Sequence, residues 1–227
     1  MPRHYMIDIE TWDTAPTAVI RAIATAIFNL DGEVIWKGLI DCRRTVDAQI
    51  ESGRTIDAAT IHWWASRTTR LSEMLDMADG KTSNVEIHTA STLGNILDSI
   101  AYATSTIQAD TRIWSRGHFD LPILAHLLTS QGRPIPWRHN QVRDVRTLDD
   151  LVPPSNATIP HHPLADCLAQ IAQVCKAMEL APATGQPHPR TVFGAGFSQP
   201  LRACPTTDWH GATTPAPDPS TQELANA

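Results

Sequence analysis

The hydrophobic pattern of the first forty residues predicts three antiparallel β-strands. Within residues 4–10, the apolar Ile7 and Ile9 alternate with the acidic Asp8 and Glu10, which is typical of a strand with two distinct faces. Two further apolar runs follow, Val19–Leu30 and Glu33–Ile40, and the dipeptide Asp31-Gly32 lies between them. Asp-Gly between apolar runs is a strong hairpin signal, because both residues accept the positive φ that a tight turn requires. We therefore expect the chain to open as a three-stranded antiparallel meander.

The pattern then changes to helices that alternate with short strands. Residues 41–54 read as a connecting loop, and a helix that carries Trp63 and Trp64 is expected to begin near Asp57. The remaining pattern predicts helices at 70–77, 93–101, 121–128 and 163–178, a helical turn at 148–151, and strands at 112–115 and 142–147. Three antiparallel strands followed by this alternation predict an α/β fold, in which helices flank both faces of a mixed sheet.

Residues 181–227 differ from the rest of the chain in composition. They are rich in Pro, Thr, Ser and Ala and contain few large apolar side chains, so they cannot bury enough surface to fold independently. With 227 residues, of which 42% are hydrophobic, the chain as a whole can form one sizeable core. We predict one domain over residues 1–180, followed by a disordered, Pro-rich tail over residues 181–227.

Composition and charge limit the class of protein further. We expect a cytoplasmic protein without membrane contact, because no apolar run is long enough to span a bilayer and no signal peptide begins the chain. The four cysteines, Cys42, Cys167, Cys175 and Cys204, show no C-x-x-C spacing and are expected to be reduced thiols. The formal net charge of -6 argues against a surface that coats nucleic acid, but not against a protein that grips only the end of a strand.

Two carboxylates at the end of the first predicted strand are candidates for a metal site. Asp8 and Glu10 are two residues apart and therefore point to one face of the strand, whereas Ile7 and Ile9 point to the other. Two like charges on one face repel each other unless a cation lies between them. A strand with a solvated acidic face is the alternative interpretation, and this short motif does not decide between the two.

Two more acidic residues lie where apolar elements begin. Asp120 falls where a predicted strand meets a helix, and Asp166 falls in the first turn of the last predicted helix. Taken singly, Asp120 is better explained as an N-cap, and Asp166 as an acid that interacts favourably with the helix dipole. Burying one carboxylate is costly, whereas several can be buried around a metal ion. The four acids together therefore favour a site for hard divalent ions.

A histidine completes the candidate set. His161 lies five residues before Asp166, just ahead of the helix, so both side chains can reach one site. His162 is the rival for that role, and we interpret it as a helix N-cap or a surface residue. A zinc site formed by His161, His162 and Cys167 is a less favoured alternative, because no second Cys/His pair has suitable spacing.

These motifs, in their order and spacing, resemble the signature of the DEDDh 3'-5' exonucleases, the DnaQ-like branch of the ribonuclease H-like fold. The signature comprises Asp8-Ile9-Glu10, Phe119-Asp120 and His161-x-x-x-x-Asp166. Longer stretches are similar to phage-type exonucleases and small bacterial 3'-5' exoribonucleases: Ile7–Thr11, Thr60–Trp64, Trp114-x-x-Gly117-x-Phe119-Asp120 and Arg143–Thr147. The resemblance covers about residues 5–178. Leu121-Pro122 and Ala165 depart from the family pattern, but neither departure removes a metal ligand.

The resemblance implies a ribonuclease H-like mixed sheet and a metal-dependent 3'-5' exonuclease domain over residues 1–180. It also implies two Mg²⁺ or Mn²⁺ ions held by four acids, Asp8, Glu10, Asp120 and Asp166. His161 would be the general base that takes a proton from the attacking water. The product would be a 5'-mononucleotide, released from the 3' end of single-stranded DNA or RNA. The main alternative is a catalytically inactive module of the same fold that binds strand ends.

Further residues are candidates for substrate binding. Adjacent helical residues point about 100° apart, so we expect one of Trp63 and Trp64 to pack and the other to stack on a terminal base. Core packing of both is equally consistent with the sequence. Asp144 could orient a metal-bound water or an arginine, or form a plain salt bridge. The predicted set is completed by Thr11, Phe119 and Arg143. The sequence leaves open the choice between DNA and RNA and the formation of a homodimer.

Overall fold

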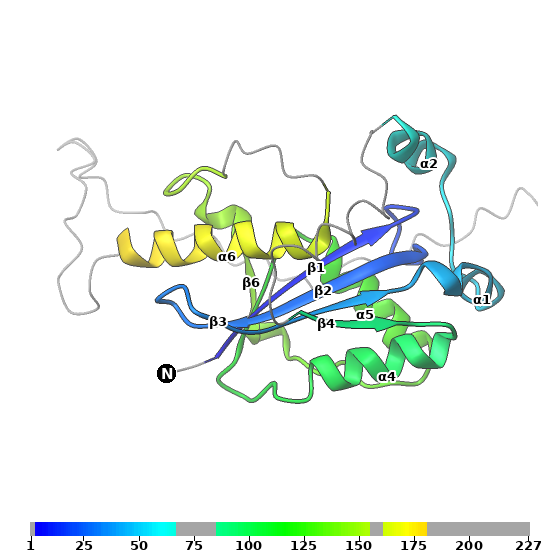
Figure 1. Ribbon diagram of the computed structural model, residues 1–227, viewed down its shortest axis with the longest axis horizontal. Helices are drawn as coiled ribbons and strands as arrows, with labels where there is room; N and C mark the ends of the chain where they lie inside the picture. The colour runs from blue at the N-terminus through cyan, green and yellow to red at the C-terminus, as the bar shows by residue number, and fades with distance from the viewer. Residues whose placement is uncertain (1–2, 67–84, 155–160, 181–227) are drawn as a thin grey trace, which may run out of the picture. The chain divides into compact units, whose positions relative to one another are not determined.

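The computed structural model describes residues 3–66, 85–154 and 161–180. Within these ranges, the strands form one six-stranded sheet of order β4-β3-β2-β1-β5-β6, with helices on both of its faces (Figure 1). This arrangement confirms the predicted mixed α/β sheet. The helix predicted at 70–77 and the Pro-rich segment at 181–227 lie outside the described residues.

The first three strands form the predicted antiparallel meander. β1 (His4–Thr11) pairs with β2 (Ile20–Phe28), which in turn pairs with β3 (Val34–Asp41). The connection between β2 and β3 contains Gly32, whose φ of +92° lies in the region that L side chains rarely adopt. All eight residues of β1 are buried, so this strand is the centre of the domain.

Three strands extend the sheet through parallel pairing. β5 (Arg112–Ser115) pairs with β1, and β6 (Val142–Asp144) pairs with β5. β6 ends earlier than the predicted strand at 142–147, because a 3-10 turn begins at Val145. At the other edge, β4 (Glu86–Thr89) pairs with β3. The sequence does not predict β4, since its four residues form no clear apolar face.

Helices cover the two faces of the sheet with separate apolar cores. α6 (Pro163–Leu180) packs on one face, against the side chains of β1 and β2. α4 (Leu93–Ala103) and α5 (Asp120–Ser130) pack on the opposite face (Figure 1). All three confirm predicted helices.

Residues 41–54, expected to form a loop, are instead mostly helical. A 3-10 turn at Arg43–Thr45 leads into α1 (Val46–Glu51). The fully buried Gln49 explains this conformation, because its side chain accepts the N–H of Ile20 and donates to the carbonyl oxygen of Ile20, both at 2.8 Å. The prediction of a loop is wrong, since this long-range pair leaves no periodic signal in the segment.

The next helix confirms its predicted start. α2 (Ala58–Ala65) is capped by Asp57, whose Oδ2 accepts the Thr60 N–H at 2.8 Å. In the described part of the chain, three cysteines, Cys42, Cys167 and Cys175, are free and buried. Across the same ranges, no helix is both long and apolar enough to cross a membrane.

Candidate active site

Asp8 and Glu10 project from the central strand into a pocket beneath α6. Their exposed fractions are only 9% and 8%, whereas Ile7 and Ile9 belong to the core on the opposite face, as the alternation predicts. The pocket has a volume of about 340 Å³. We call it the carboxylate pocket, because it is lined by all four predicted acids together with His161 and Phe119.

Small side chains on β2 let α6 approach the sheet closely. Ala24 and Ala22 are the β2 residues paired with Asp8 and Glu10. Above them, the thiol of Cys167 on α6 lies 3.7 Å from the carbonyl oxygen of Ala24. Larger residues at these two β2 positions would push the helix away from the strand that carries the carboxylates.

Asp120 connects α5 to the central strand. It is the first residue of the helix, and its Oδ1 accepts the backbone N–H of Ile9 at 3.3 Å. Phe119 holds the N-cap position, so the N-cap interpretation of Asp120 is wrong. Burial raises the pKa of the Asp120 carboxyl to about 7, although backbone N–H groups and the charge of Arg146 favour its ionised form.

α6 contributes Asp166 and Gln170 to the same pocket. The two residues occupy positions i and i+4, so they share one face of the helix. The amide of Gln170 donates to Asp8 Oδ1 at 2.9 Å, while the buried Gln170 Oε1 has no hydrogen-bond partner among the described residues. Burial raises the pKa of Asp166 to about 7. Sequence reasoning missed Gln170, although its spacing from Asp166 could have revealed it.

The charges of the pocket repel one another. Burial, and then repulsion by the other three acids, raises the pKa of Asp8 well above its usual range. Burial, followed by repulsion from Asp166, also raises the pKa of Glu10, and Arg21 opposes this effect. Glu10, His161 and Asp166 each offer a ligand atom, and these atoms lie within 4.8 Å of one another. Clustered carboxylate oxygens that repel one another form a donor set that fits hard divalent ions such as Mg²⁺ or Mn²⁺.

The two adjacent histidines occupy different environments. His162 is buried, and its Nδ1 accepts the backbone N–H groups of Leu164 and Ala165 at 3.1 and 3.3 Å. This geometry confirms the interpretation of His162 as the N-cap of α6. His161 lines the carboxylate pocket instead. Since His162 caps the helix and the thiol of Cys167 faces β2, the zinc alternative finds no support in this geometry.

A second pocket, of about 480 Å³, adjoins the first. We call it the aromatic pocket, because Trp63 and Trp64 line it together with Thr11, and it shares Glu10 and Phe119 with the carboxylate pocket. Trp64 is buried and its Nε1 donates to the carbonyl oxygen of Thr11 at 2.9 Å, whereas Trp63 is 37% exposed. The expectation that one tryptophan packs and the other stays accessible is confirmed.

A row of aromatic rings links the two pockets. The ring of Trp63 lies edge-on to those of His161 and Trp64, with centroids 4.7 and 4.9 Å away. The guanidinium of Arg21 lies between two indole rings, 3.8 Å from Trp64 and 4.1 Å from Trp12. Arg21 is buried, and this burial lowers its pKa to about 10. No local pattern in the sequence indicates this sandwich.

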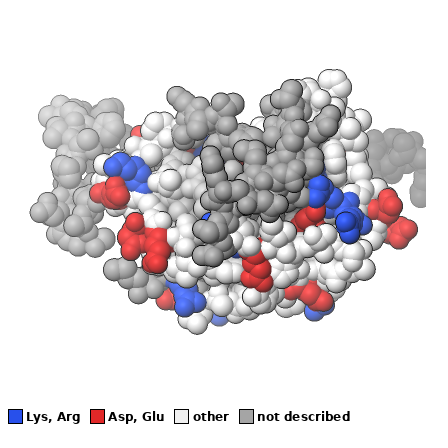
Figure 2. Space-filling view, viewed as in Figure 1, with Lys and Arg blue, Asp and Glu red and all other residues white. Residues whose placement is uncertain are grey.

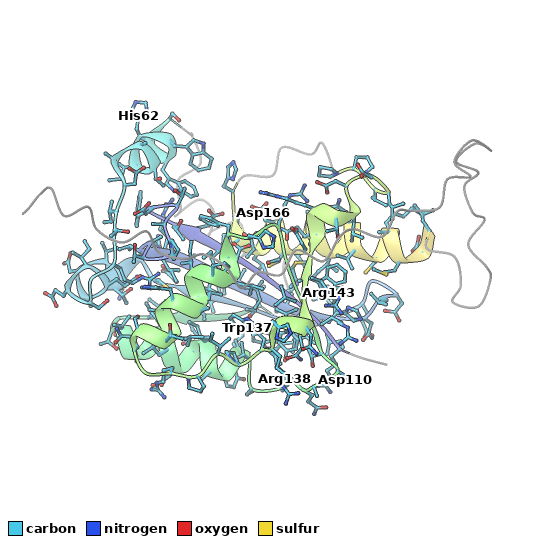
Figure 3. All side chains as sticks on the ribbon, turned by 180° about the vertical axis from the view of Figure 1, so that it is seen from behind. His62, Asp110, Trp137, Arg138, Arg143 and Asp166 are labelled. Atoms are coloured by element: carbon cyan, nitrogen blue, oxygen red, sulfur yellow. The ribbon has the colours of Figure 1, made fainter. Side chains whose placement is uncertain are left out.

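Two of the predicted substrate-binding residues line neither of these pockets. The guanidinium of Arg143 donates to backbone carbonyl groups. Figure 3 labels Arg143 and Asp166 at separate places on the molecule. Asp144 accepts backbone N–H groups instead. The other predicted residues, Thr11, Trp63, Trp64 and Phe119, all line the aromatic pocket.

Positive charge is present at the carboxylate pocket but is not spread over the surface in view. Figure 2 shows basic side chains interspersed with acidic ones, in keeping with the net charge of -6. At the pocket itself, Arg116 and Arg146 contribute to the lining. Sequence reasoning missed both as pocket residues, although the Arg143–Thr147 motif contains Arg146.

Comparison with solved structures places the fold among exonuclease I proteins. The E. coli exonuclease I complex with a dA16 oligonucleotide matches with a TM-score of 0.53 and 14% identity, over 79% of this chain and 41% of that one. The zinc-bound E. coli exonuclease I–ssDNA complex matches with a TM-score of 0.52 and 16% identity, over 81% and 42%. Exonuclease I from Methylocaldum szegediense matches with a TM-score of 0.51 and 16% identity, over 81% and 42%. At these identities the likeness concerns the fold, and this chain spans less than half the length of these relatives.

The family assignment comes from a sequence model. A comparison with curated proteins found no match. The family model of the 3'-5' exoribonuclease Rv2179c-like domain matches residues 3–178, which include all four acids and His161. The chain therefore belongs to the family of Rv2179c-like 3'-5' exoribonuclease domains, and the predicted class of DEDDh 3'-5' exonuclease is confirmed.

Proposed function

We propose that this chain hydrolyses the last phosphodiester bond at the 3' end of single-stranded DNA or RNA and releases a 5'-mononucleotide. The observation that carries the proposal is the convergence of four acids and His161 on one pocket. These residues come from β1, from the start of α5, and from the first turn of α6 and the segment just before it, which are distant in the sequence. A purely structural role does not explain so many mutually repelling carboxyl groups in one place.

The four acids would hold two divalent ions, Mg²⁺ or Mn²⁺. When bound, such ions stabilise the negative charge on the attacking and leaving oxygens of the phosphodiester. Asp8, Glu10, Asp120 and Asp166 would have to be ionised to act as ligands, and binding would displace their protons. Gln170 supports this arrangement, because its amide fixes the orientation of the Asp8 carboxylate.

His161 would remove the proton of the attacking water at a ring nitrogen. An ordinary histidine pKa of about 6.5 suits a general base near neutral pH. Two carboxylates, Glu10 and Asp166, lie close enough to stabilise the imidazolium that forms. The edge-on contact with Trp63 and the N-cap at His162 restrict the position of the ring.

The aromatic pocket would receive the terminal base of the strand. Because this pocket shares Glu10 and Phe119 with the carboxylate pocket, a base held here would place its own phosphate near the acids. Every base has a π face, so stacking on Trp63 would give affinity of about 1–3 kcal/mol per base without sequence preference.

Product analysis tests the proposal. Single-stranded DNA and RNA of one sequence, labelled at the 5' end, would be incubated with wild-type protein in Mg²⁺ or Mn²⁺. We expect a ladder that shortens from the 3' end, release of 5'-mononucleotides, and no products with Asp8→Asn. Binding without any product, for both nucleic acids and both metals, would favour the inactive end-binding module.

A further inference from the structure

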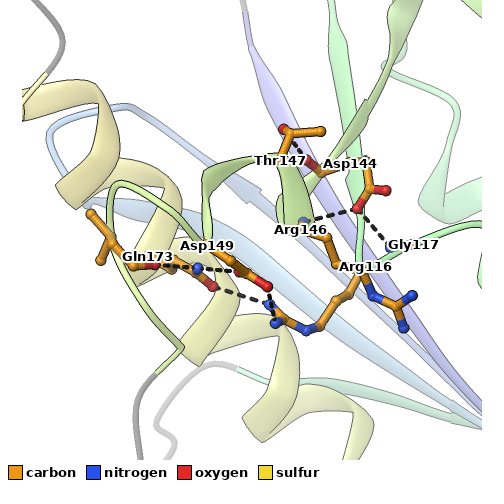
Figure 4. A network of polar contacts seen from close by, with 8 residues as sticks. Arg116, Gly117, Asp144, Arg146, Thr147, Asp149 and Gln173 are labelled. Carbon is orange, nitrogen blue, oxygen red and sulfur yellow. Dashed lines mark hydrogen bonds and ion pairs between the residues drawn. The ribbon is translucent and has the colours of Figure 1, made fainter.

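Two arginines line the carboxylate pocket, and their electrostatic environments differ. Arg116 forms an ion pair with Asp149 at 2.8 Å and donates to the side chain of Gln173 at 3.2 Å (Figure 4). Gln173 donates to Asp149 at 2.8 Å, so the charge of Arg116 is both neutralised and held in place. In the part of the chain that the structure describes, the guanidinium of Arg146 forms no ion pair.

Asp144 and Gly117 hold Arg146 in position. The Oδ1 atom of Asp144 accepts the backbone N–H groups of Arg146 at 2.9 Å and Gly117 at 2.8 Å (Figure 4). The guanidinium lies directly against Gly117, because a Cβ added there would be 2.8 Å from Arg146 Cζ and 2.9 Å from Nη1. Gly117 also has a φ of +82°, which favours glycine. This glycine therefore supplies both the space and the backbone conformation that the arrangement requires.

We propose that Arg146 binds a phosphate of the nucleic-acid strand, and that Gly117 and Asp144 orient its guanidinium for this contact. The inference rests on the proposed function and adds a phosphate-binding residue to it. Arg146 is exposed, and it lines the same pocket as Asp120 and the other three acids. A guanidinium can donate two parallel hydrogen bonds to phosphate oxygens, which an ammonium group cannot do in a fixed geometry.

Arg146 would also explain how an acidic protein attracts a polyanion at this point. The other ionisable groups around the pocket are carboxyls, His161 and the already paired Arg116. Metal ions would neutralise the carboxylates, but the next phosphate along the strand would still need a cation. A single fixed guanidinium meets this need without a broad basic surface.

The test is a double-mutant cycle between the protein and the substrate. Binding of a short, labelled single strand would be measured in Ca²⁺, with one uncharged methylphosphonate placed in turn at the first, second and third linkages from the 3' end. We expect Arg146→Ala to weaken binding of the unmodified strand about tenfold. At one linkage, methylphosphonate should weaken binding to wild type but not further weaken binding to Arg146→Ala.

Two further variants separate charge from geometry. Arg146→Lys keeps the charge without the guanidinium fork and should restore binding only in part. Gly117→Ala should weaken binding by displacing the guanidinium while leaving the net charge unchanged. Arg133→Ala is the matched control, because it also removes one positive charge, but from an exposed pair with Asp98 outside both pockets. We expect near-wild-type binding and an unchanged salt dependence for this control.

The salt dependence adds an independent readout. Loss of one phosphate contact should reduce the slope of log K against log salt by about 0.7 in Arg146→Ala. Equal methylphosphonate effects in wild type and Arg146→Ala at all three linkages, or an unchanged salt slope, would overturn the inference. Cleavage in Mg²⁺ or Mn²⁺ is measured separately. If wild type cleaves and the coupling is absent, only the role of Arg146 fails; if the coupling is present without cleavage, the proposed function fails and the phosphate contact stands.

Discussion

The two faces of β1 consist of alternating residues of one strand, yet they contribute to stability in opposite ways. Ile7 and Ile9 pack into the apolar core formed with α4 and α5, and burial of such a side chain stabilises the fold by about 1.5–3 kcal/mol. Asp8 and Glu10 are nearly as well buried, but burial and repulsion by other carboxylates of the pocket raise their pKa values well above normal. Packing of the apolar face keeps β1 rigid. The strand can therefore hold the acidic side chains in position although their burial is unfavourable.

The largest expected effect comes from a change on the acidic face. Asp8→Asn should abolish nuclease activity, because it removes a proposed metal ligand, and should raise the melting temperature of the metal-free protein by removing one repelling charge. Single-turnover cleavage in Mn²⁺ and thermal unfolding in EDTA measure the two effects. Near-normal activity of purified Asp8→Asn would show that the site is assigned wrongly.

The matched change on the apolar face should have the opposite signature. Ile7 is 1% exposed, so Ile7→Ala should lower the free energy of unfolding by about 2–5 kcal/mol through lost burial and an internal cavity. Activity per folded molecule at low temperature should stay near the wild-type value, since the side chain points away from the pocket. A folded but inactive Ile7→Ala protein would contradict the claim that the apolar face of β1 contributes to stability but not to activity.

The adjacent histidines allow a sharper test at the start of α6. His161→Ala should lower the turnover rate by about 10² or more, the usual contribution of a general base. His162→Ala should have a much smaller effect on turnover, but should destabilise the fold by about 1 kcal/mol through loss of the N-cap. A larger loss of turnover in His162→Ala would assign the general base to His162. Equal losses would leave no evidence that His161 acts as the general base.

The acidic face also predicts a dependence of stability on pH. The pKa of Asp166 is about 7 in the folded protein, against a usual value of 3.8. Between these values the unfolded chain has released a proton that the folded state keeps, so this group destabilises the metal-free fold progressively as the pH rises. The free energy of unfolding of Asp166→Asn relative to wild type, measured in EDTA, should therefore increase from about pH 4 to pH 7. A difference that stays constant or falls over this range would contradict the argument that burial raises the pKa of Asp166.

A further expected effect concerns binding at the aromatic pocket. Trp63→Ala should weaken binding of a short single strand by about 1–3 kcal/mol without changing the salt slope, because stacking involves no ion release. Tyr102→Ala is a suitable control, since Tyr102 is 54% exposed and lies outside both pockets. Binding in Ca²⁺ that is indifferent to Trp63→Ala would leave this tryptophan with a packing role only.

Local patterns predict much of this architecture. The alternation in β1, the glycine in the β2–β3 turn and the cap at Asp57 each depend on residues that are close in sequence. The four acids and His161 can be found because they lie at the ends of such elements and match a family signature. Features that depend on distant partners cannot be found in this way, as the Gln49–Ile20 pair and the Arg21 sandwich show.

The arginines show why the candidate substrate-binding residues are harder to predict than the acids. A strand extending to Thr147 would treat Arg143 and Arg146 as neighbours on one element. In the structure β6 ends at Asp144, and the following 3-10 turn carries Arg146 to the carboxylate pocket. The end of this short strand depends on Asp144 and on the backbone of Gly117, which belongs to another part of the chain.

Calorimetric titration of the metal-free protein with Mn²⁺ at neutral pH tests the central claim most directly. We expect wild type to bind two ions and to release protons as the acids ionise, and Ile7→Ala, where folded, to bind the same number. Asp8→Asn should lose at least one ion and part of the proton release. Absence of Mn²⁺ binding by wild type, or identical titrations for wild type and Asp8→Asn, would contradict the account of the acidic face as a metal site.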